Sequence, residues 1–220
     1  MGMTKTMKIY DITPVISSRM AVFPGDVPYS REVTLDFSSG NNLLLSSMRT
    51  TMHLGAHADA SNHYNEQGEG IDKRDLSYYL GPVQVVRVTT KRGDRIKLED
   101  LGDEQVNAQR ILFCTGSYPD PDSWNSDFTS LSPDLVDFLA SHGVILVGID
   151  TPSIDPSEDK ALLSHARVAH HKMAILEGVV LETVPQGIYD LIALPLKIEN
   201  ADASPVRAVL LPSGSLTLGI

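Results

Sequence analysis

The sequence predicts an α/β fold, in which a large mixed β-sheet or barrel-like core is flanked by helices. Many short runs of β-branched or apolar residues are bounded by Gly, Pro or Asn, as strands commonly are. Helical patterns are fewer and are interspersed among these runs, which favours a sheet covered by helices. The chain has 220 residues with no repeat or linker. We therefore expect one domain over 1–220, with residues 1–7 flexible.

The expected strands are distributed along the whole chain. Three of them, at 83–90, 111–115 and 144–149, are almost entirely apolar, which is typical of strands buried on both faces. The remaining expected strands are 8–12, 31–37, 43–52, 174–181, 189–197 and 206–211.

Helix signals mark three further segments. Ser132 is a good N-cap, Pro133 follows at the first helical position, and Gly143 ends the apolar pattern. A second helix is expected over about 157–172, because acidic residues follow a serine at its start. A weaker helical pattern covers 98–107.

The charge of the chain restricts its partners. It carries 18 basic and 28 acidic residues, a formal net charge of −10. Nucleic acids and anionic membranes attract basic surfaces, so we expect neither as a partner. No apolar run is long enough to cross a membrane, and the first residues lack the pattern of a signal peptide. Cys114 is the single cysteine, so no internal disulfide can form, and we expect a cytoplasmic protein.

The stretch "TTMHLGAHADASNHY", residues 50–64, concentrates chemistry in a few positions. It contains His53, His57, Asp59 and His63, separated mainly by small residues. A fully extended chain would hold His53 and Asp59 about 20 Å apart, and a single helix would point Asp59 away from both histidines. The chain must therefore curl if these groups share one metal, and Gly55 permits close curling. The alternative is a polar loop with solvated histidines. The spacing favours a site for zinc, manganese or iron(II).

A second cluster lies towards the C-terminus. His165, His170 and His171 fall on the expected second helix, and Glu177 follows within an apolar run. Any one of these histidines alone fits a solvated helix face. A carboxylate among apolar neighbours is costly to bury unless it is paired or binds metal, although an edge strand could expose it. The cluster supplies candidates for completing a metal site.

Several stretches resemble one enzyme family. "HLGAHADASNHY" is similar to the H-x-G-[TA]-H-x-D-x-P-x-H signature of the cyclase family of metal-dependent hydrolases. "VFPGDVPYS", "GIDTPSIDP" and the segment beginning "HHKMAILEGVV" resemble the kynurenine formamidase (arylformamidase) branch of this family. The similarity extends over nearly the whole chain. It implies a swivelling β/α/β fold, a homodimer and two divalent metal ions per chain, most commonly Zn²⁺ with Mn²⁺ as the alternative.

The resemblance also implies roles for individual residues. In the family, the first two histidines and the aspartate of the signature bind one metal, the aspartate bridges to a second, and a later histidine and glutamate complete the second site. The last histidine of the signature transfers protons, and an aromatic residue before Pro-Gly-Asp contacts the substrate. The implied metal ligands are His53, His57, Asp59, His165 and Glu177, with His170 or His171 as substitutes for His165; the implied catalytic residue is His63 and the implied substrate contact is Phe23.

Two departures from the family pattern stand out. Ser61 replaces the usual proline of the signature, and Phe23 stands where tryptophan is more common. Neither change removes an implied ligand. Ser61 has no nucleophile elbow around it, so we interpret it as a small turn residue.

The activity implied by the resemblance is hydrolysis of N-formyl-L-kynurenine to L-kynurenine and formate, a step of tryptophan degradation. A related hydrolase acting on isatin or another cyclic or aryl amide would use the same metals. A third alternative is an iron(II) oxygenase, because His57 and Asp59 with a distant histidine imitate a 2-His-1-carboxylate site. The interspersed helices and the additional ligand candidates His53 and Glu177 argue against the oxygenase.

Overall fold

The computed structural model describes residues 8–216, and its central element is a mixed sheet of nine strands. The four strands β5, β7, β9 and β10 run parallel to one another, and antiparallel strands extend the sheet on both sides. Across the sheet the strands are β1 (Tyr10–Asp11), β13 (Val209–Pro212), β11 (Gly187–Ile192), β5 (Leu80–Arg87), β7 (Arg110–Cys114), β9 (Leu146–Ile149), β10 (Ala174–Glu177), β4 (His57–Asp59) and β12 (Ala203–Pro205).

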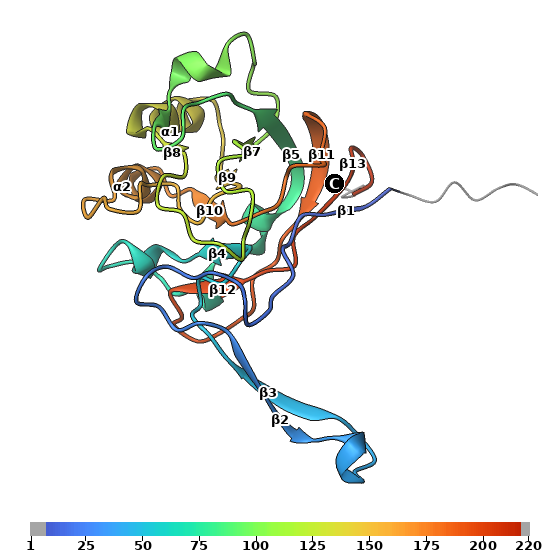
Figure 1. The fold of residues 1–220 in the computed structure, drawn as a ribbon. Coiled ribbons are helices and arrows are strands. Elements are labelled where there is room, and N and C mark those ends of the chain that lie inside the picture. Colours follow the sequence, from blue (N-terminus) through green and yellow to red (C-terminus); the bar gives the residue numbers. More distant parts are fainter. Residues whose placement is uncertain (1–7, 217–220) are drawn as a thin grey trace, which may run out of the picture.

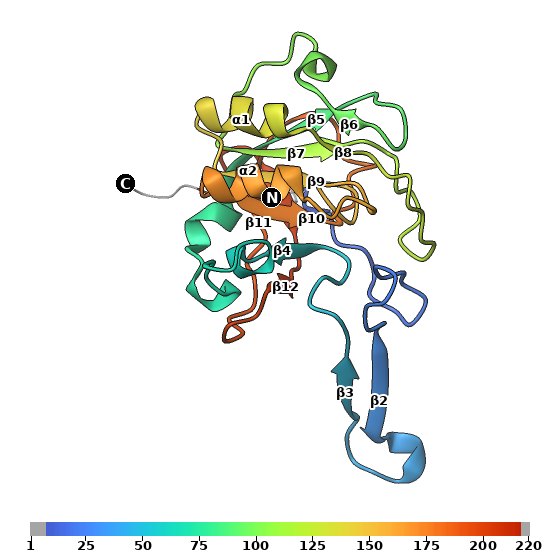
Figure 2. The same ribbon diagram turned by 90° about the vertical axis from the view of Figure 1, so that its left-hand side faces the viewer.

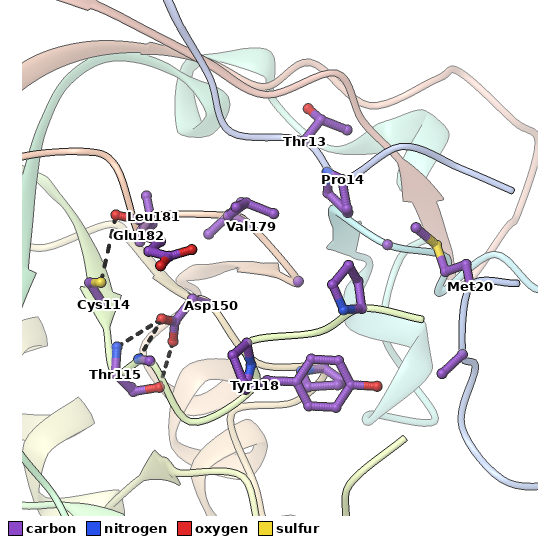
Figure 3. A pocket seen from close by; sticks show the side chains of 18 of the residues that line it. Thr13, Pro14, Met20, Cys114, Thr115, Tyr118, Asp150, Val179, Leu181 and Glu182 are labelled. Carbon is purple, nitrogen blue, oxygen red and sulfur yellow. Dashed lines mark hydrogen bonds between the residues drawn. The ribbon is translucent and has the colours of Figure 1, made fainter. Parts of the chain in front are cut away.

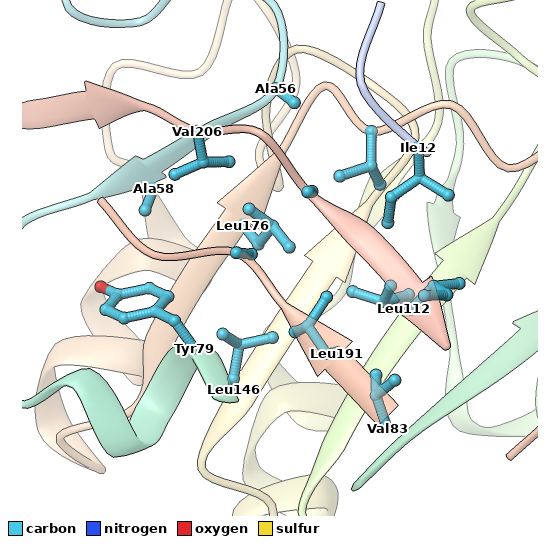
Figure 4. Close-up of a cluster of buried hydrophobic side chains, with 14 of the residues drawn as sticks. Ile12, Ala56, Ala58, Tyr79, Val83, Leu112, Leu146, Leu176, Leu191 and Val206 are labelled. Atoms are coloured by element: carbon cyan, nitrogen blue, oxygen red, sulfur yellow. The ribbon is translucent and has the colours of Figure 1, made fainter. Parts of the chain in front are cut away.

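The sheet curls, and two helices lie against its outer face (Figure 1). These are α1 (Pro133–Ser141) and α2 (Leu163–His170). Successive side chains of β7 alternate between two hydrophobic cores, because neighbouring residues of a strand point to opposite faces. Leu112 belongs to the core inside the curl, which Figure 4 shows, whereas Ile111 and Phe113 belong to the core shared with the helices. The sheet is therefore covered on both faces, and the predicted fold class is confirmed.

A separate hairpin extends away from this body (Figures 1 and 2). It consists of β2 (Ser30–Leu35) and β3 (Leu45–Arg49), with one 3₁₀ turn, Phe37–Ser39, near its tip. A further short pair joins β6 (Arg95–Ile96) to β8 (Ser130–Leu131). The other 3₁₀ turns are Ser61–His63, Ile71–Lys73, Leu76–Tyr79 and Leu98–Leu101.

Helix boundaries follow their capping groups. The Ser132 side chain accepts a hydrogen bond from the Leu135 amide at 3.2 Å, so α1 begins where the sequence predicts. The prediction for 157–172 is wrong at its start, because the helix begins at Leu163. The Asp155 carboxylate accepts hydrogen bonds from the backbone amides of Ser164 and His165, and it thereby fixes the start of α2.

Three further expectations concern the segment 98–107, residues 1–7 and membrane-spanning helices. The weak helical pattern at 98–107 forms only one 3₁₀ turn, which ends at Gly102 with a φ of 56°. The expectation for residues 1–7 concerns a segment outside the described residues. Within 8–216, no helix is long and apolar enough to span a membrane.

Candidate metal centre

The histidine stretch bends at Gly55 and then continues as β4. Gly55 has a φ of 56°, a left-handed conformation that glycine adopts without steric cost, so the curl predicted from the sequence is present at this residue. A side chain on Gly178 would place its Cβ 2.1 Å from the Gly55 carbonyl oxygen, so the end of β10 packs directly on the bend. His57 and Asp59 alternate along β4 with buried alanines, and they therefore share one face of the sheet.

Three nitrogen and oxygen atoms from this stretch converge. Asp59 Oδ1 lies 3.1 Å from His53 Nδ1 and 3.5 Å from His57 Nε2. Donor atoms about 2.1 Å from a tetrahedral metal lie roughly 3.4 Å from one another. The spacing of His53, His57 and Asp59 therefore suits one divalent ion.

A second group of donor atoms shares Asp59. Its other oxygen, Oδ2, lies 3.6 Å from His165 Nε2, which is in turn 3.6 Å from Glu177 Oε1. Glu177 is paired with His57 in the antiparallel register of β10 and β4, and its Oε2 is 3.2 Å from His57 Nε2. Asp59 and Glu177 each have one carboxylate oxygen near His57, in the first group, and the other near His165, in the second group.

Glu177 is not on an edge strand. β10 lies between β9 and β4, and Glu177 is 2% exposed. The Ile154 backbone amide donates a hydrogen bond of 2.7 Å to Glu177 Oε1 and fixes its orientation. The exposed-edge alternative is therefore wrong, and this buried carboxylate has one hydrogen bond and two imidazole neighbours to offset its burial.

Each of the three imidazoles has an acceptor on its outer side. The outer nitrogen of His57, Nδ1, lies 2.9 Å from the Gly55 carbonyl oxygen, and that of His165 lies 2.7 Å from Asp155 Oδ2. The outer nitrogen of His53, Nε2, lies 3.1 Å from Asp202 Oδ2. When each outer nitrogen carries its hydrogen, the inner nitrogen presents a lone pair, as metal-binding histidines require.

The buried atoms at the centre lack ordinary partners. His57 Nε2 and both carboxylate oxygens of Asp59 make no hydrogen bond within the described chain, although they are fully buried. Unpaired buried polar atoms are costly, and charged ones more so. A bound cation removes this cost, and imidazoles with carboxylates form the donor set that zinc and similar ions use. These residues therefore fit a divalent metal.

The electrostatics of the protein groups also favour positive charge. Burial lowers the pKa of His53 and of His165, but carboxylates outweigh it. Contact with Asp59 chiefly raises the pKa of His53 to about 9, and Asp155 with Asp59 raises that of His165 to about 10. For Asp59, burial raises the pKa, but His165 and His53 hold it well below its ordinary value. The centre stabilises bound cations, whether protons or metal ions.

His63 lies beside this centre and outside both groups that share Asp59, although its ring nitrogen forms a third, more exposed set of donor atoms with His53 and Asp202. It is on the 3₁₀ turn after β4, and its side chain is 34% exposed. Its ring centroid is 4.2 Å from that of His53 and 6.2 Å from that of His165. Burial lowers the pKa of His63, Asp59 opposes this and His53 adds to it, and the net shift below the ordinary histidine value favours the neutral imidazole.

The other candidates lie elsewhere. His170 is exposed on α2, and His171 Nε2 contacts Asp137 Oδ1 at 2.8 Å, so neither approaches Asp59 in the way that His165 does. The Ser61 hydroxyl accepts a hydrogen bond from the Glu69 amide at 2.8 Å and lies 3.2 Å from the Glu69 carbonyl oxygen. Ser61 is therefore a turn residue.

A cavity of about 600 Å³ adjoins the candidate metal centre. Figure 3 shows other residues that line this cavity. His53 and His57 form part of its wall, and it opens at the carboxyl ends of β5, β7, β9 and β10, where ligands of α/β proteins commonly bind. Three aromatic side chains form another part of the wall. Phe23 packs on Trp124 with ring centroids 4.6 Å apart, and Trp124 is 6.1 Å from Tyr118.

Comparison with known proteins places the chain in a family. Residues 10–156 match the Cyclase family model, described as "Putative cyclase". The chain belongs to the cyclase family. The match covers the histidine stretch, and it confirms the resemblance inferred from the sequence.

Solved structures support this assignment. A "potential metal-dependent hydrolase with cyclase activity" is 26% identical, with a TM-score of 0.80 over 94% of this chain and 98% of that one. A "predicted metal-dependent hydrolase" from Bacillus stearothermophilus is 27% identical, with a TM-score of 0.79 over the same shares. Isatin hydrolase A from Labrenzia aggregata is 19% identical and has the same fold, with a TM-score of 0.82 over 94% of each chain. The chain has the fold of cyclase-family metal-dependent hydrolases.

Sequence reasoning missed the groups that surround the ligands. Asp155, Asp202, Tyr118 and Trp124 were not predicted. Both carboxylates lie in stretches that the resemblance marks without assigning them a role: Asp155 in "GIDTPSIDP" and Asp202 in the segment beginning "HHKMAILEGVV". Asp202 is 149 positions from His53, so nothing near His53 in the sequence indicates their contact.

Proposed function

We propose that this protein is a metal-dependent arylformamidase that hydrolyses N-formyl-L-kynurenine to L-kynurenine and formate. The observation that carries the proposal is the pair of donor groups that share Asp59 and adjoin an aromatic-walled cavity. We assign two divalent ions to them, with Zn²⁺ first and Mn²⁺ second. His53, His57 and Asp59 hold one ion, and Asp59, His165 and Glu177 hold the other.

The chemistry divides between the ions and the protein. Two divalent ions, when bound, lower the pKa of water towards neutrality and polarise a carbonyl group. His63 is neutral at pH 7, so it accepts the proton that water loses as its oxygen adds to the formyl carbon. His63 then delivers this proton to the aniline nitrogen as the C–N bond breaks. Water supplies one oxygen of formate and the proton that reaches the aniline nitrogen, and its second proton is released as formate forms, so no protein nucleophile is needed.

The aromatic wall supports an aryl substrate. Phe23, Tyr118 and Trp124 offer ring faces and edges to an aniline ring, and such aromatic contacts favour offset or edge-to-face packing. Isatin is the second candidate, because a protein of the same fold is an isatin hydrolase. Both substrates contain an aryl amide, so the wall alone does not separate them.

A direct assay tests the proposal. The purified protein is stripped with a chelator, reloaded with Zn²⁺ or Mn²⁺, and assayed on N-formyl-L-kynurenine and on isatin, with metal content measured on the same sample. We expect activity to follow metal loading and kcat/KM to be higher for N-formyl-L-kynurenine. A higher kcat/KM for isatin would support the second candidate. A fully loaded protein that hydrolyses neither amide would refute the arylformamidase assignment.

We also propose a homodimer, for which the β2–β3 hairpin is the supporting feature. An isolated two-stranded hairpin is marginally stable in water, and this one leaves several large apolar side chains uncovered. They are Val33 (45% exposed), Phe37 (66%), Leu44 (48%), Leu45 (51%) and Met48 (66%). Packing against a second copy would cover them. Sedimentation at micromolar concentration is expected to give a dimer, and a fully active monomer would contradict this.

A further inference from the structure

Three groups accept a hydrogen bond from the outer nitrogen of a ligand histidine, and among them Asp202 is the one that is substantially exposed. Its Oδ2 is 3.1 Å from His53 Nε2, on the opposite side of the ring from the Nδ1 that faces Asp59. The Asp202 side chain is 49% exposed, whereas Asp155, the equivalent acceptor for His165, is fully buried. His53 itself lies on the more open side of the centre, with 15% of its side chain exposed.

The backbone holds Asp202 in place without help from its side chain. The Ala60 amide donates a hydrogen bond of 2.8 Å to the Asp202 carbonyl oxygen, directly beyond the paired strands β4 and β12. Ala203, the next residue, is opposite Asp59 in that register. The Asp202 backbone therefore has a fixed position relative to β4, and a substitution of its side chain leaves this anchor intact.

The same carboxylate also faces His63. Asp202 Oδ2 is 4.0 Å from His63 Nδ1, and the rings of His53 and His63 are tilted by 44° to one another. Asp202 Oδ2 thus lies between the outer nitrogen of an implied ligand and a nitrogen of the implied proton-transfer group.

We propose that Asp202 is a positioning residue of the metal centre, which fixes His53 for metal binding and limits the orientations of His63. When Asp202 accepts a hydrogen bond from His53 Nε2, it selects the tautomer of His53 in which Nδ1 carries the lone pair. This lone pair is directed towards Asp59 and the first donor group. Loss of such an outer partner typically weakens metal binding or activity 10- to 100-fold. The inference rests on the metal sites of the proposed function.

The test measures metal affinity directly. Chelator-stripped wild type, Asp202→Ala and Asp202→Asn are titrated with Zn²⁺ against a chromophoric competitor, and thermal unfolding is recorded for each stripped protein. Asp202→Ala removes the acceptor, so we expect one Zn²⁺ to bind roughly 10- to 100-fold more weakly while the other is unchanged. Asp202→Asn retains an amide oxygen in the same place, so its loss is expected to be smaller. Asp137→Ala is the matched control, since it removes a carboxylate–imidazole contact with His171 outside the centre.

Kinetics provide a second readout. With saturating Zn²⁺, Asp202→Ala is expected to lower kcat and to leave KM nearly unchanged, because His63 loses a neighbour that limits its orientations. Unchanged affinity for both ions in Asp202→Ala would overturn the inference while leaving the proposed function intact. Loss of one whole ion in both variants would overturn the inference, because Asp202 would then be a direct ligand. Equally weaker binding of both ions together with a lower Tm would also overturn it, because Asp202 would then have only a structural role. A wild type that binds no divalent ion would overturn the metal centre itself.

Discussion

Replacing His63 with alanine separates proton transfer from metal binding. The donor atoms around Asp59 come from His53, His57, His165 and Glu177, and His63 is not among the closest contacts of Asp59. His63→Ala is therefore expected to retain both metal ions. Its side chain is 34% exposed, so its removal opens space to solvent and leaves the hydrophobic cores unchanged.

The size of the effect follows from the role of the imidazole. A positioned acid–base group contributes about 10²- to 10⁴-fold in turnover, which corresponds to about 3–5 kcal/mol of activation free energy. Asp59 and Glu177 are the carboxylates that act most on the protonated form of His63, and Asp202 adds a contact 4.0 Å from its Nδ1. Such a pair is worth about 1 kcal/mol in water and about 4 kcal/mol near a protein surface, and the 49% exposure of Asp202 favours the lower end. At that lower end Asp202 contributes about fivefold, well below the roughly 10²- to 10⁴-fold expected of proton transfer.

The assay compares turnover, metal content and pH dependence. Burial lowers the pKa of His63, so the wild-type rate is expected to fall only when the pH drops below the usual histidine range, as His63 becomes protonated. This acid limb is expected to disappear in His63→Ala, and added imidazole is expected to restore part of the rate. If His63→Ala instead loses metal and recovers with excess Zn²⁺, His63 is a ligand and the assigned role is wrong.

Three further predictions concern the ligands. Glu177→Gln retains the shape of the side chain but not its charge, so metal content and hydrolytic activity are expected to fall together. Two fully bound ions in this variant would contradict the assignment of Glu177 as a ligand. His165→Ala is expected to lose one ion per chain and His171→Ala none, and equal losses in the two would argue against His165. In the metal-free protein, burial lowers the pKa values of His53 and His165. Contacts with carboxylates outweigh burial and raise these pKa values to about 9 and about 10, so both imidazoles are protonated at pH 7. Metal binding is therefore expected to release protons and to weaken as pH falls. Calorimetry in buffers of different ionisation enthalpy measures this proton release, and finding none would contradict the prediction.

Local patterns were sufficient for the elements whose determinants are local. β7 and β9 are apolar runs because both faces of these strands are buried, and α1 begins at Ser132 because capping depends on neighbouring residues. β4 was not predicted as a strand, although the curl before it was. Three residues are too few for a periodic pattern, and pairing with β10 and β12 keeps them extended.

The same reasoning explains the missed start of α2 and the missed acceptors. The cap of this helix is Asp155, which reaches it only after the chain has passed through the turns at 157–162. Contact between Asp155 and His165 spans ten positions, and contact between Asp202 and His53 spans 149. A signature motif identifies ligands because they cluster in sequence, whereas the groups that orient them are brought together only by the folded sheet.

Burial across the centre is unequal, and this inequality indicates which side serves the chemistry. His165, Glu177 and Asp59 are at most 2% exposed, and His165 is held by the buried Asp155. His53 and His63 are 15% and 34% exposed at the side chain. Buried ligands with rigid partners suit a permanently held ion, whereas the solvent-facing side can admit water and release product. If the ions are bound as proposed, water and substrate would reach them from this more exposed side, where His53 lines the cavity. Asp202, with 49% of its side chain exposed, lies on that side against His53 and His63, as expected of the positioning role proposed for it.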